Sequence, residues 1–336
     1  MAPSFDNETS LFNSVVRDGN GVKGIGDLGI SKVPQAYIQP PAEQINKKHA
    51  SKCEIPPIDL SKLDGPDHDE VVNQIVRAAE TLGFFQVVNH GVPTELLDSL
   101  KQTAHNFFGL PPERKSVYRK EVSPSPLVKY GTSFVPEKEK AWNGKTILAW
   151  LTPMMMKLFN SGLDVALQYL KTSHEMVRKL LEALLGNLGA ELDDSKIDAF
   201  IGKKMVNMNF YLTCPNPELT IGVGRHSDMD TLTILLQDGI GSLYIKAPQV
   251  VNMEKKGEWV EIPPISGALV INIGYMLQIW SNGRYKSAEH IVRTTMVEKD
   301  GAARYKEFLF SDYMNNFFGN AHHSKKSIEF AKTNSA

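Results

Sequence analysis

The stretch GRHSDMDTLTILLQD, Gly224–Asp238, places a histidine–x–aspartate pair directly before an apolar, β-prone run. His226 and Asp228 are two positions apart, and we expect them at the mouth of a strand, where alternation puts both side chains on one face. An imidazole and a carboxylate side by side can bind one divalent metal ion. Asp230 competes with Asp228, but it lies deeper in the expected strand, so Asp228 is the preferred ligand.

A third metal ligand is expected at His290, in YKSAEHIVRTT, Tyr285–Thr295. Two histidines and one carboxylate on one face leave three coordination positions open, which is the arrangement of non-haem Fe(II) oxygenases. Those positions can take a bidentate 2-oxo acid and O2. Alone, a His-x-Asp pair often occurs by chance and a single histidine is more often a packed or surface residue. We interpret His90, His105 and His174 as structural.

The composition indicates a cytoplasmic protein. A formal net charge of −1 gives no electrostatic basis for binding nucleic acid or a membrane surface. Cys53 and Cys214 are far apart and belong to no CxxC pair, which suits free thiols in a reducing compartment. The N-terminus has no secretory signal pattern, and no apolar run is long enough to span a bilayer. Nothing demands a partner subunit, so we expect a monomer.

Periodicity predicts an α+β chain with a helical first half and a β-rich second half. We expect an extended N-terminal arm with one helix over 1–52, a helical region over 53–200, a β domain over 201–300, and a C-terminal helix and tail over 301–336. The predicted helices lie at Asp67–Gly83, Pro93–Pro111 and Val165–Gly189. The predicted strands lie at Cys53–Leu63, Phe84–Gly91, Lys204–Cys214, Thr231–Asp238, Gly241–Ala247, Glu258–Pro264 and Gly267–Gly274.

Several stretches together resemble the plant 2-oxoglutarate/Fe(II)-dependent dioxygenases. They are GFFQVVNHGV (Gly83–Val92), NMNFYLTCPNPELTIGVGRHSDMDTLTILLQDGIG (Asn207–Gly241), GALVINIG (Gly267–Gly274) and SNGRYKSAEH (Ser281–His290). The resemblance implies a double-stranded β-helix, or jelly-roll, core behind a helical N-terminal region. It implies His226, Asp228 and His290 as iron ligands, with no catalytic residue beyond the metal centre. It also implies Asn209 and Tyr211 as 2-oxoglutarate contacts, although on composition alone they are ordinary strand residues.

The resemblance also implies a reaction. In this family the decarboxylation of 2-oxoglutarate to succinate is coupled to hydroxylation of a substrate by O2, with ascorbate as the usual reductant. Within the family the chain is most similar to the hydroxylases of coumarin biosynthesis, so we expect a small aromatic substrate, either a coumarin or a hydroxycinnamoyl-CoA. A cupin-like metal protein of another class is an alternative, and the matches over Gly83–Gly91 and Val206–Gly241 argue against it.

The chain departs from the family pattern after His290. The family has an Arg-x-Ser motif about ten residues later, and its arginine binds the distal carboxylate of 2-oxoglutarate as a bidentate pair. Here the corresponding positions are Asp300 and Ala302. We therefore predict that this anchor and the core strand that carries it are missing, which destabilises the β-core and weakens 2-oxoglutarate binding. Arg293 and Arg304 are possible substitutes, and a catalytically impaired or non-catalytic chain is the alternative to an active hydroxylase.

A second departure is AWNGKTILAWLTPMMMKLFNSG, Ala141–Gly162, where the family has an EWKDY-like pattern followed by TND and WP. Loss of one base from a message that encodes the family pattern gives Ala141–Ile147 as they stand. Our hypothesis is a frame-shifted segment, and the alternative is a divergent helix rich in methionine. Lys246–Trp259 is also longer than usual, and Tyr275 stands where the family usually has aspartate. A faulty gene model or a decaying gene copy would explain these departures together.

Overall fold

The strands are organised around two sheets that face each other. The computed structural model describes residues 8–41, 44, 51–53, 55–119, 122–123, 128–132, 141–142, 144–151, 162–190, 193–202, 204–246 and 259–296. One sheet has the order β1 (Ser51–Lys52), β11 (Trp259–Ile262), β10 (Leu243–Lys246), β13 (His290–Arg293) and β8 (Ile221–His226). The other has the order β2 (Ile58–Asp59), β3 (Phe84–Val88), β12 (Leu269–Ile273) and β9 (Leu232–Leu235). Pairing is antiparallel except for β1 with β11 and β2 with β3.

Strand alternation divides the apolar side chains of β12 between two cores. Val270 points toward the first sheet, where it packs in one buried cluster with Phe84, Leu243, Ile245, Val260 and Ile262. Leu269, Ile271 and Ile273 point the other way and pack on helices. The strand LVINI is therefore buried on both faces, as its nearly continuous apolar sequence predicts.

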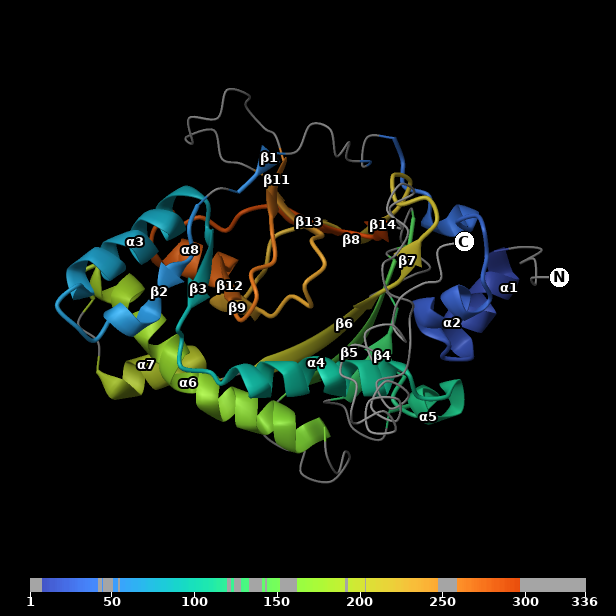
Figure 1. Cartoon of the computed structure of the whole chain (residues 1–336), viewed down its shortest axis with the longest axis horizontal. Helices are drawn as coiled ribbons and strands as arrows, with labels where there is room; N and C mark the ends of the chain where they lie inside the picture. The colour runs from blue at the N-terminus through green and yellow to red at the C-terminus, as the bar shows by residue number, and fades with distance from the viewer. Residues whose placement is uncertain are drawn as a thin grey trace, which may run out of the picture.

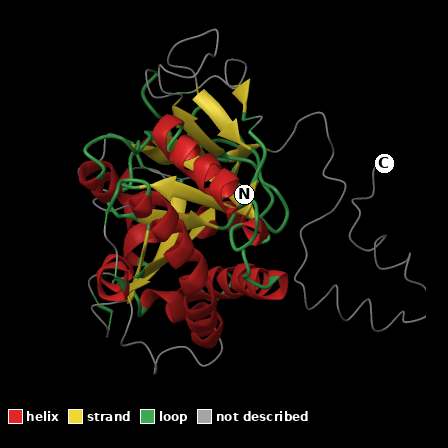
Figure 2. Ribbon diagram, turned by 90° about the vertical axis from the view of Figure 1, so that its left-hand side faces the viewer, coloured by secondary structure: helices red, strands yellow, loops and turns green. Residues whose placement is uncertain are grey.

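Helices cover the outer face of the second sheet (Figures 1 and 2). They are α3 (His68–Thr81), α4 (Thr94–Phe108), α6 (Gly162–Gly186) and α7 (Asp194–Ile201), whereas α5 (Pro112–Ser116) lies away from this sheet, beyond the end of α4 (Figure 1). The three helices predicted from periodicity are confirmed as α3, α4 and α6. Beyond α3 the chain turns into β3 at Gly83, whose φ is +68° and whose Cα lies so close to the backbone of Lys286 that a side chain would clash.

A third sheet has the order β4 (Val128–Gly131), β5 (Lys145–Leu151) and β6 (Met205–Tyr211). β5 is its central strand and pairs antiparallel with both neighbours. The alternative of a divergent helix over Ala141–Gly162 is therefore wrong for residues 145–151, where β-branched and aromatic side chains favour a strand. Residues 152–161 lie outside the described part, and the frame shift stays a hypothesis.

The N-terminal arm is more structured than its sequence indicated. It contains α1 (Glu8–Phe12), the helical turn η1 (Asn13–Arg17), α2 (Gly21–Asp27) and the short helix η2 (Gln35–Tyr37). These elements pack around Trp142, whose ring meets Phe12 and Tyr37 edge-on at centroid distances of 5.9 and 5.5 Å. The expectation of an extended arm with one helix is wrong because several short apolar patches, each weak alone, pack on one distant tryptophan.

Some predictions fall beyond the described residues. The C-terminal helix and tail over 301–336, Arg304 and the missing core strand after His290 all lie there, and the four domain boundaries stay predictions. β14 (Thr295–Met296), which pairs in parallel with β7 (Thr213–Cys214), is the last described strand. No helix within the described ranges is long and apolar enough to cross a membrane. Cys53 and Cys214 are free thiols.

Candidate metal centre

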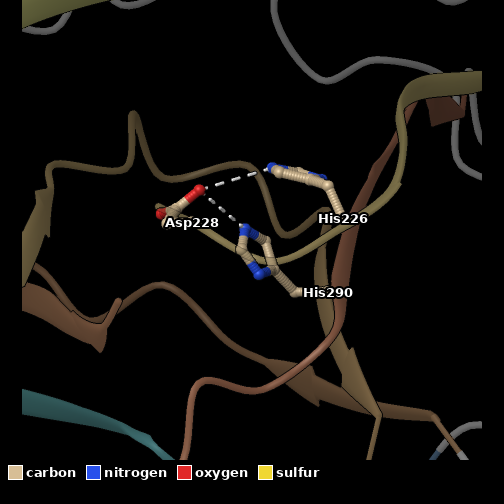
Figure 3. A group of neighbouring side chains, drawn as sticks. All are labelled: His226, Asp228 and His290. Carbon is tan, nitrogen blue, oxygen red and sulfur yellow. Dashed lines mark ion pairs between the residues drawn. The ribbon is translucent and has the colours of Figure 1, made fainter. Parts of the chain in front are cut away.

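His226, Asp228 and His290 come together at the ends of two paired strands (Figure 3). His226 is the last residue of β8 and His290 the first of β13, and the two are direct partners in the register. Their rings lie 4.1 Å apart between centroids. Asp228 follows in the loop between β8 and β9, so it does not reach the site by strand alternation, as the sequence pattern suggested. The chain turns after His226, and the carboxylate of Asp228 lies beside both rings (Figure 3).

The spacing of the three side chains fits one metal ion. Asp228 Oδ1 lies 3.7 Å from His226 Nε2 and 3.8 Å from His290 Nε2. A metal–nitrogen bond is about 2.1 Å, so a single ion between these atoms can reach all three. Asp230, the competing carboxylate, is not part of this cluster. The preference for Asp228 over Asp230 therefore agrees with the geometry.

Both imidazoles present the nitrogen that a metal needs. His226 Nδ1 lies 2.8 Å from the Gly224 carbonyl oxygen, and His290 Nδ1 lies 3.2 Å from the Ala288 carbonyl oxygen. A carbonyl only accepts, so each Nδ1 carries the proton and donates. Each Nε2 lone pair is then directed at the space between the three side chains. Backbone carbonyls that orient ligand histidines in this way are typical of metal sites.

Burial favours the neutral form of the deeper histidine. The His290 side chain is 7% exposed, against 22% for Asp228 and 37% for His226. Burial, with a smaller contribution from His226, lowers the pKa of His290, while the Asp228 carboxylate opposes this shift. A neutral imidazole is the form that binds a metal. The site is closed beneath His290 and more open beside His226.

The loop that carries Asp228 is fixed by the start of helix α8 (Tyr275–Trp280). The amides of Gly274, Tyr275 and Met276 donate to the carbonyl oxygens of Thr231, Asp228 and Asp230 at 3.1, 2.8 and 3.1 Å. The contact of Tyr275 comes from its backbone, so having tyrosine where the family usually has aspartate does not remove this support. The Tyr275 side chain itself is exposed.

Two further residues touch Asp228, and sequence analysis missed both. Thr233 Oγ1 and Asn272 Nδ2 each donate to Asp228 Oδ2 at 2.6 Å. The signal for Asn272 was present, because it is the one polar residue inside the otherwise apolar strand LVINI. Thr233 has no comparable signal, since threonine is common in strands.

The structure brings one of the expected 2-oxoglutarate contacts next to the ligand-bearing strand. The Tyr211 ring packs on Gly222 of β8, four residues before His226, so closely that a Cβ at Gly222 would lie 2.6 Å from it. Burial, followed by the charge of Asp238, raises the pKa of Tyr211, so its hydroxyl stays a donor. Asn209, two residues earlier on β6, is exposed. The role of both residues stays a prediction.

Arg293 does not approach the metal centre. Its backbone amide donates to the Ser242 carbonyl at 2.9 Å, in register with the β10–β13 pairing. Alternation along β13 sends its side chain to the face opposite His290. There the guanidinium lies 5.8 Å from the centre of the Tyr244 ring, and within the described part of the chain its buried Nη1 has no hydrogen-bond partner. Arg293 is therefore a poor substitute for the family's 2-oxoglutarate anchor.

Two family models match the chain. Residues 55–155 match the N-terminal domain described as non-haem dioxygenase in morphine synthesis, and residues 202–310 match the 2OG-Fe(II) oxygenase superfamily. The second match contains the whole candidate metal centre. The crystal structure of JOX2 in complex with 2OG, Fe and JA is similar, with a TM-score of 0.68, 26% identity, and coverage of 93% of this chain and 97% of that one. A rice dioxygenase for auxin oxidation shares the fold, with a TM-score of 0.59, 21% identity, and coverage of 83% of this chain and 100% of that one.

Curated relatives match over almost the full length. The chain is 54% identical to scopoletin 8-hydroxylase of Arabidopsis thaliana over 99% of both chains. It is 42% identical to feruloyl CoA ortho-hydroxylase F6H1-3 of Ipomoea batatas, over 97% of this chain and 98% of the relative. The first alignment runs over 362 residues, whereas this chain has 336, so the Arabidopsis protein has positions with no counterpart here. The chain belongs to the plant 2-oxoglutarate/Fe(II)-dependent dioxygenases.

Proposed function

We propose that this chain is a 2-oxoglutarate- and Fe(II)-dependent aromatic hydroxylase that acts on a coumarin, as the scopoletin 8-hydroxylase of Arabidopsis thaliana does on scopoletin. The observation that carries the proposal is the His226–Asp228–His290 cluster in a chain 54% identical to that enzyme along its whole length. The proposed fold of residues 201–300 is the jelly roll of the family, between a helical region over 53–200 and a C-terminal segment over 301–336.

The donor set fits Fe(II). Two Nε2 lone pairs and one carboxylate oxygen meet at one point, because the other ring nitrogens and the other carboxylate oxygen are already engaged by hydrogen bonds. Two histidines and one carboxylate on one face are the ligand set of non-haem iron oxygenases. Iron and 2-oxoglutarate bound there would supply the activation of O2, and ascorbate would keep the iron reduced. The chain itself positions the three ligands and excludes water on the His290 side.

Tyr211 and Asn209 are the proposed 2-oxoglutarate contacts. Tyr211 keeps its proton and can donate a hydrogen bond to a carboxylate. Its ring lies against the strand that ends at His226. The small aromatic substrate would bind beside His226, where the centre is least buried. We expect the protein to act as a cytoplasmic monomer.

A second candidate is a catalytically impaired family member. One reason is that the Arabidopsis relative has positions with no counterpart here. Another is that Arg293 lies on the face of β13 opposite His290, so its side chain is directed away from the metal centre. Without a cationic anchor, 2-oxoglutarate loses a charge-assisted bidentate contact. Its affinity should then fall by orders of magnitude, and turnover would need a large excess of the co-substrate.

The test is a matched assay on the full chain with Fe(II), ascorbate and 2-oxoglutarate titrated to saturation. Scopoletin and feruloyl-CoA serve as alternative substrates, and product and succinate are both quantified by mass spectrometry. Hydroxylated scopoletin with equimolar succinate supports the proposal, and hydroxylated feruloyl-CoA assigns the other substrate class. Iron binding with no succinate at any 2-oxoglutarate concentration establishes the impaired chain. His290→Ala removes one proposed iron ligand, so any product that this variant forms comes from iron bound outside the site.

A further inference from the structure

The two oxygens of the Asp228 carboxylate have different surroundings. Oδ1 faces His226 Nε2 and His290 Nε2 and has no donor from the protein among the described residues. Oδ2 accepts two hydrogen bonds at 2.6 Å, one from Thr233 Oγ1 and one from Asn272 Nδ2. A charged carboxylate that accepts two short bonds on one oxygen is held in a fixed orientation.

We propose that Thr233 and Asn272 are positioning residues that restrict Asp228 to binding the metal through one oxygen. This inference rests on the proposed metal-binding role of the cluster. A carboxylate can bind a metal through one oxygen or both, and the second mode would occupy one of the three open positions. A 2-oxo acid needs two positions and O2 needs the third. Holding Oδ2 away from the metal therefore keeps the centre open for both.

The two donors are placed by a rigid element rather than by a loop. Thr233 lies on β9 and Asn272 on β12, and they are direct partners in the antiparallel register. Cross-strand partners point to the same face of a sheet, so both side chains reach Asp228 together. Asp228 itself lies in a loop whose backbone is held by α8, and the two donors add contacts to the carboxylate itself. The pair fastens the loop carboxylate to the second sheet.

Asn272 occupies its position at a cost to stability. Its side chain is 2% exposed, and its buried Oδ1 has no hydrogen-bond partner among the residues that the structure describes. Rotating the side-chain amide by 180° would not give Oδ1 a donor, because Oδ1 would then face the negative Oδ2 of Asp228. An apolar residue would suit the interior of LVINI better. A buried polar side chain in an otherwise apolar strand is expected where function requires it.

The Thr233 hydroxyl donates its hydrogen bond to the carboxylate of Asp228. A hydroxyl has one proton to donate, and Thr233 Oγ1 lies 2.6 Å from Asp228 Oδ2 but 3.0 Å from Asp230 Oδ2. The shorter contact takes the hydrogen bond. Asp230 thus flanks the site without competing for the metal, which agrees with its absence from the cluster.

Mn(II) binding to the full-length chain tests the inference without any turnover. The variants are Thr233→Val and Asn272→Leu, which keep the number and branching of the side-chain heavy atoms and remove the donor, with Thr233→Ser as the conservative rescue. Thr231→Val is the matched control, because Thr231 supports the loop through its backbone carbonyl. Free Mn(II) is measured by electron paramagnetic resonance, and water bound to the protein-held Mn(II) is measured by proton relaxation. Thermal unfolding of the metal-free chains reports stability separately.

We expect Thr233→Val and Asn272→Leu to weaken Mn(II) binding by about 10- to 100-fold. Where Asp228 turns to bind through both oxygens, bound water falls by about one third, from three positions to two. Thr233→Ser and Thr231→Val should keep the native affinity. Native affinity and relaxation in Thr233→Val and Asn272→Leu would overturn the inference and leave the metal site intact. No Mn(II) binding by the native chain would overturn the metal site and the inference together, whereas binding without turnover would overturn only the proposed hydroxylase.

Discussion

Gly274→Ala should loosen the metal centre although Gly274 is not a ligand. Gly274 is the N-cap residue that precedes α8, and a Cβ added there would lie 2.6 Å from the carbonyl carbon of Asp230 and closer to the carbonyl oxygen. Ordinary carbon contacts are about 3.5–4.0 Å, so the loop must move by roughly 1 Å. The φ of Gly274 is −88°, so the clash, and not backbone strain, is the cause.

The size of the effect follows from the contacts that this movement disturbs. Three backbone hydrogen bonds join Gly274, Tyr275 and Met276 to the loop. Each contributes about 0.5–1.5 kcal/mol net, so the joint loss of all three costs about 1.5–4.5 kcal/mol. Replacing glycine with alanine restricts the unfolded chain and returns up to about 1 kcal/mol. We expect a net loss of about 1–4 kcal/mol in the free energy of unfolding. We also expect weaker Mn(II) binding, because the Asp228 carbonyl is one of the acceptors.

Urea denaturation and Mn(II) titration of the purified variant measure both effects. Gly186→Ala is the matched control, because a Cβ at Gly186 meets open space at the end of α6 and should not destabilise the chain. If Gly274→Ala has the native free energy of unfolding and the native Mn(II) affinity, the role assigned to the α8 contacts is wrong. A loss of stability without any loss of Mn(II) affinity would show that the α8 contacts stabilise the loop but do not position Asp228.

Three further changes test other parts of the structure. Arg293→Met should leave the KM for 2-oxoglutarate unchanged, because Arg293 lies on the sheet face opposite His290; a tenfold rise in KM would instead identify it as the anchor. Tyr211→Phe should raise the KM for 2-oxoglutarate by about tenfold or more, as expected for loss of a hydrogen bond to a charged group, and should leave the affinity for Mn(II) unchanged. Trp142→Ala should cost about 3–5 kcal/mol in the free energy of unfolding and speed proteolysis within residues 8–37, since the N-terminal arm packs around this ring; an equally resistant arm would contradict that packing.

Sequence patterns were sufficient where one element determines its own structure. Apolar periodicity predicted α3, α4 and α6, and alternating or apolar runs predicted β3, β9, β10, β11 and β12, whereas β1 and β8 were not predicted. The three residues of the metal cluster were also identified, because two histidines and a carboxylate are an uncommon combination. The prediction that strand alternation brings Asp228 to the site was wrong. The spacing of two residues cannot show that the strand ends at His226 and that the carboxylate comes from the following loop.

Features that depend on contacts between residues far apart in the sequence could not be predicted from local patterns. The pairing of Thr233 with Asn272 is a matter of register between strands almost forty residues apart in sequence, which no local pattern shows. The fold of the N-terminal arm depends on Trp142, more than a hundred residues later. The position of Arg293 could have been inferred, because it is an odd number of residues from His290 and alternation then places it on the other face.

Isotope labelling tests the central claim most directly. The full chain is incubated with Fe(II), ascorbate, saturating 2-oxoglutarate and scopoletin under ¹⁸O2, and the products are weighed by mass spectrometry. A 2-oxoglutarate-dependent hydroxylase places one atom of ¹⁸O in succinate and the other in the new hydroxyl group of the coumarin, and His290→Ala forms neither product. Product without labelled succinate, or no coupled product at any 2-oxoglutarate concentration, would contradict the assignment of this chain as an active dioxygenase.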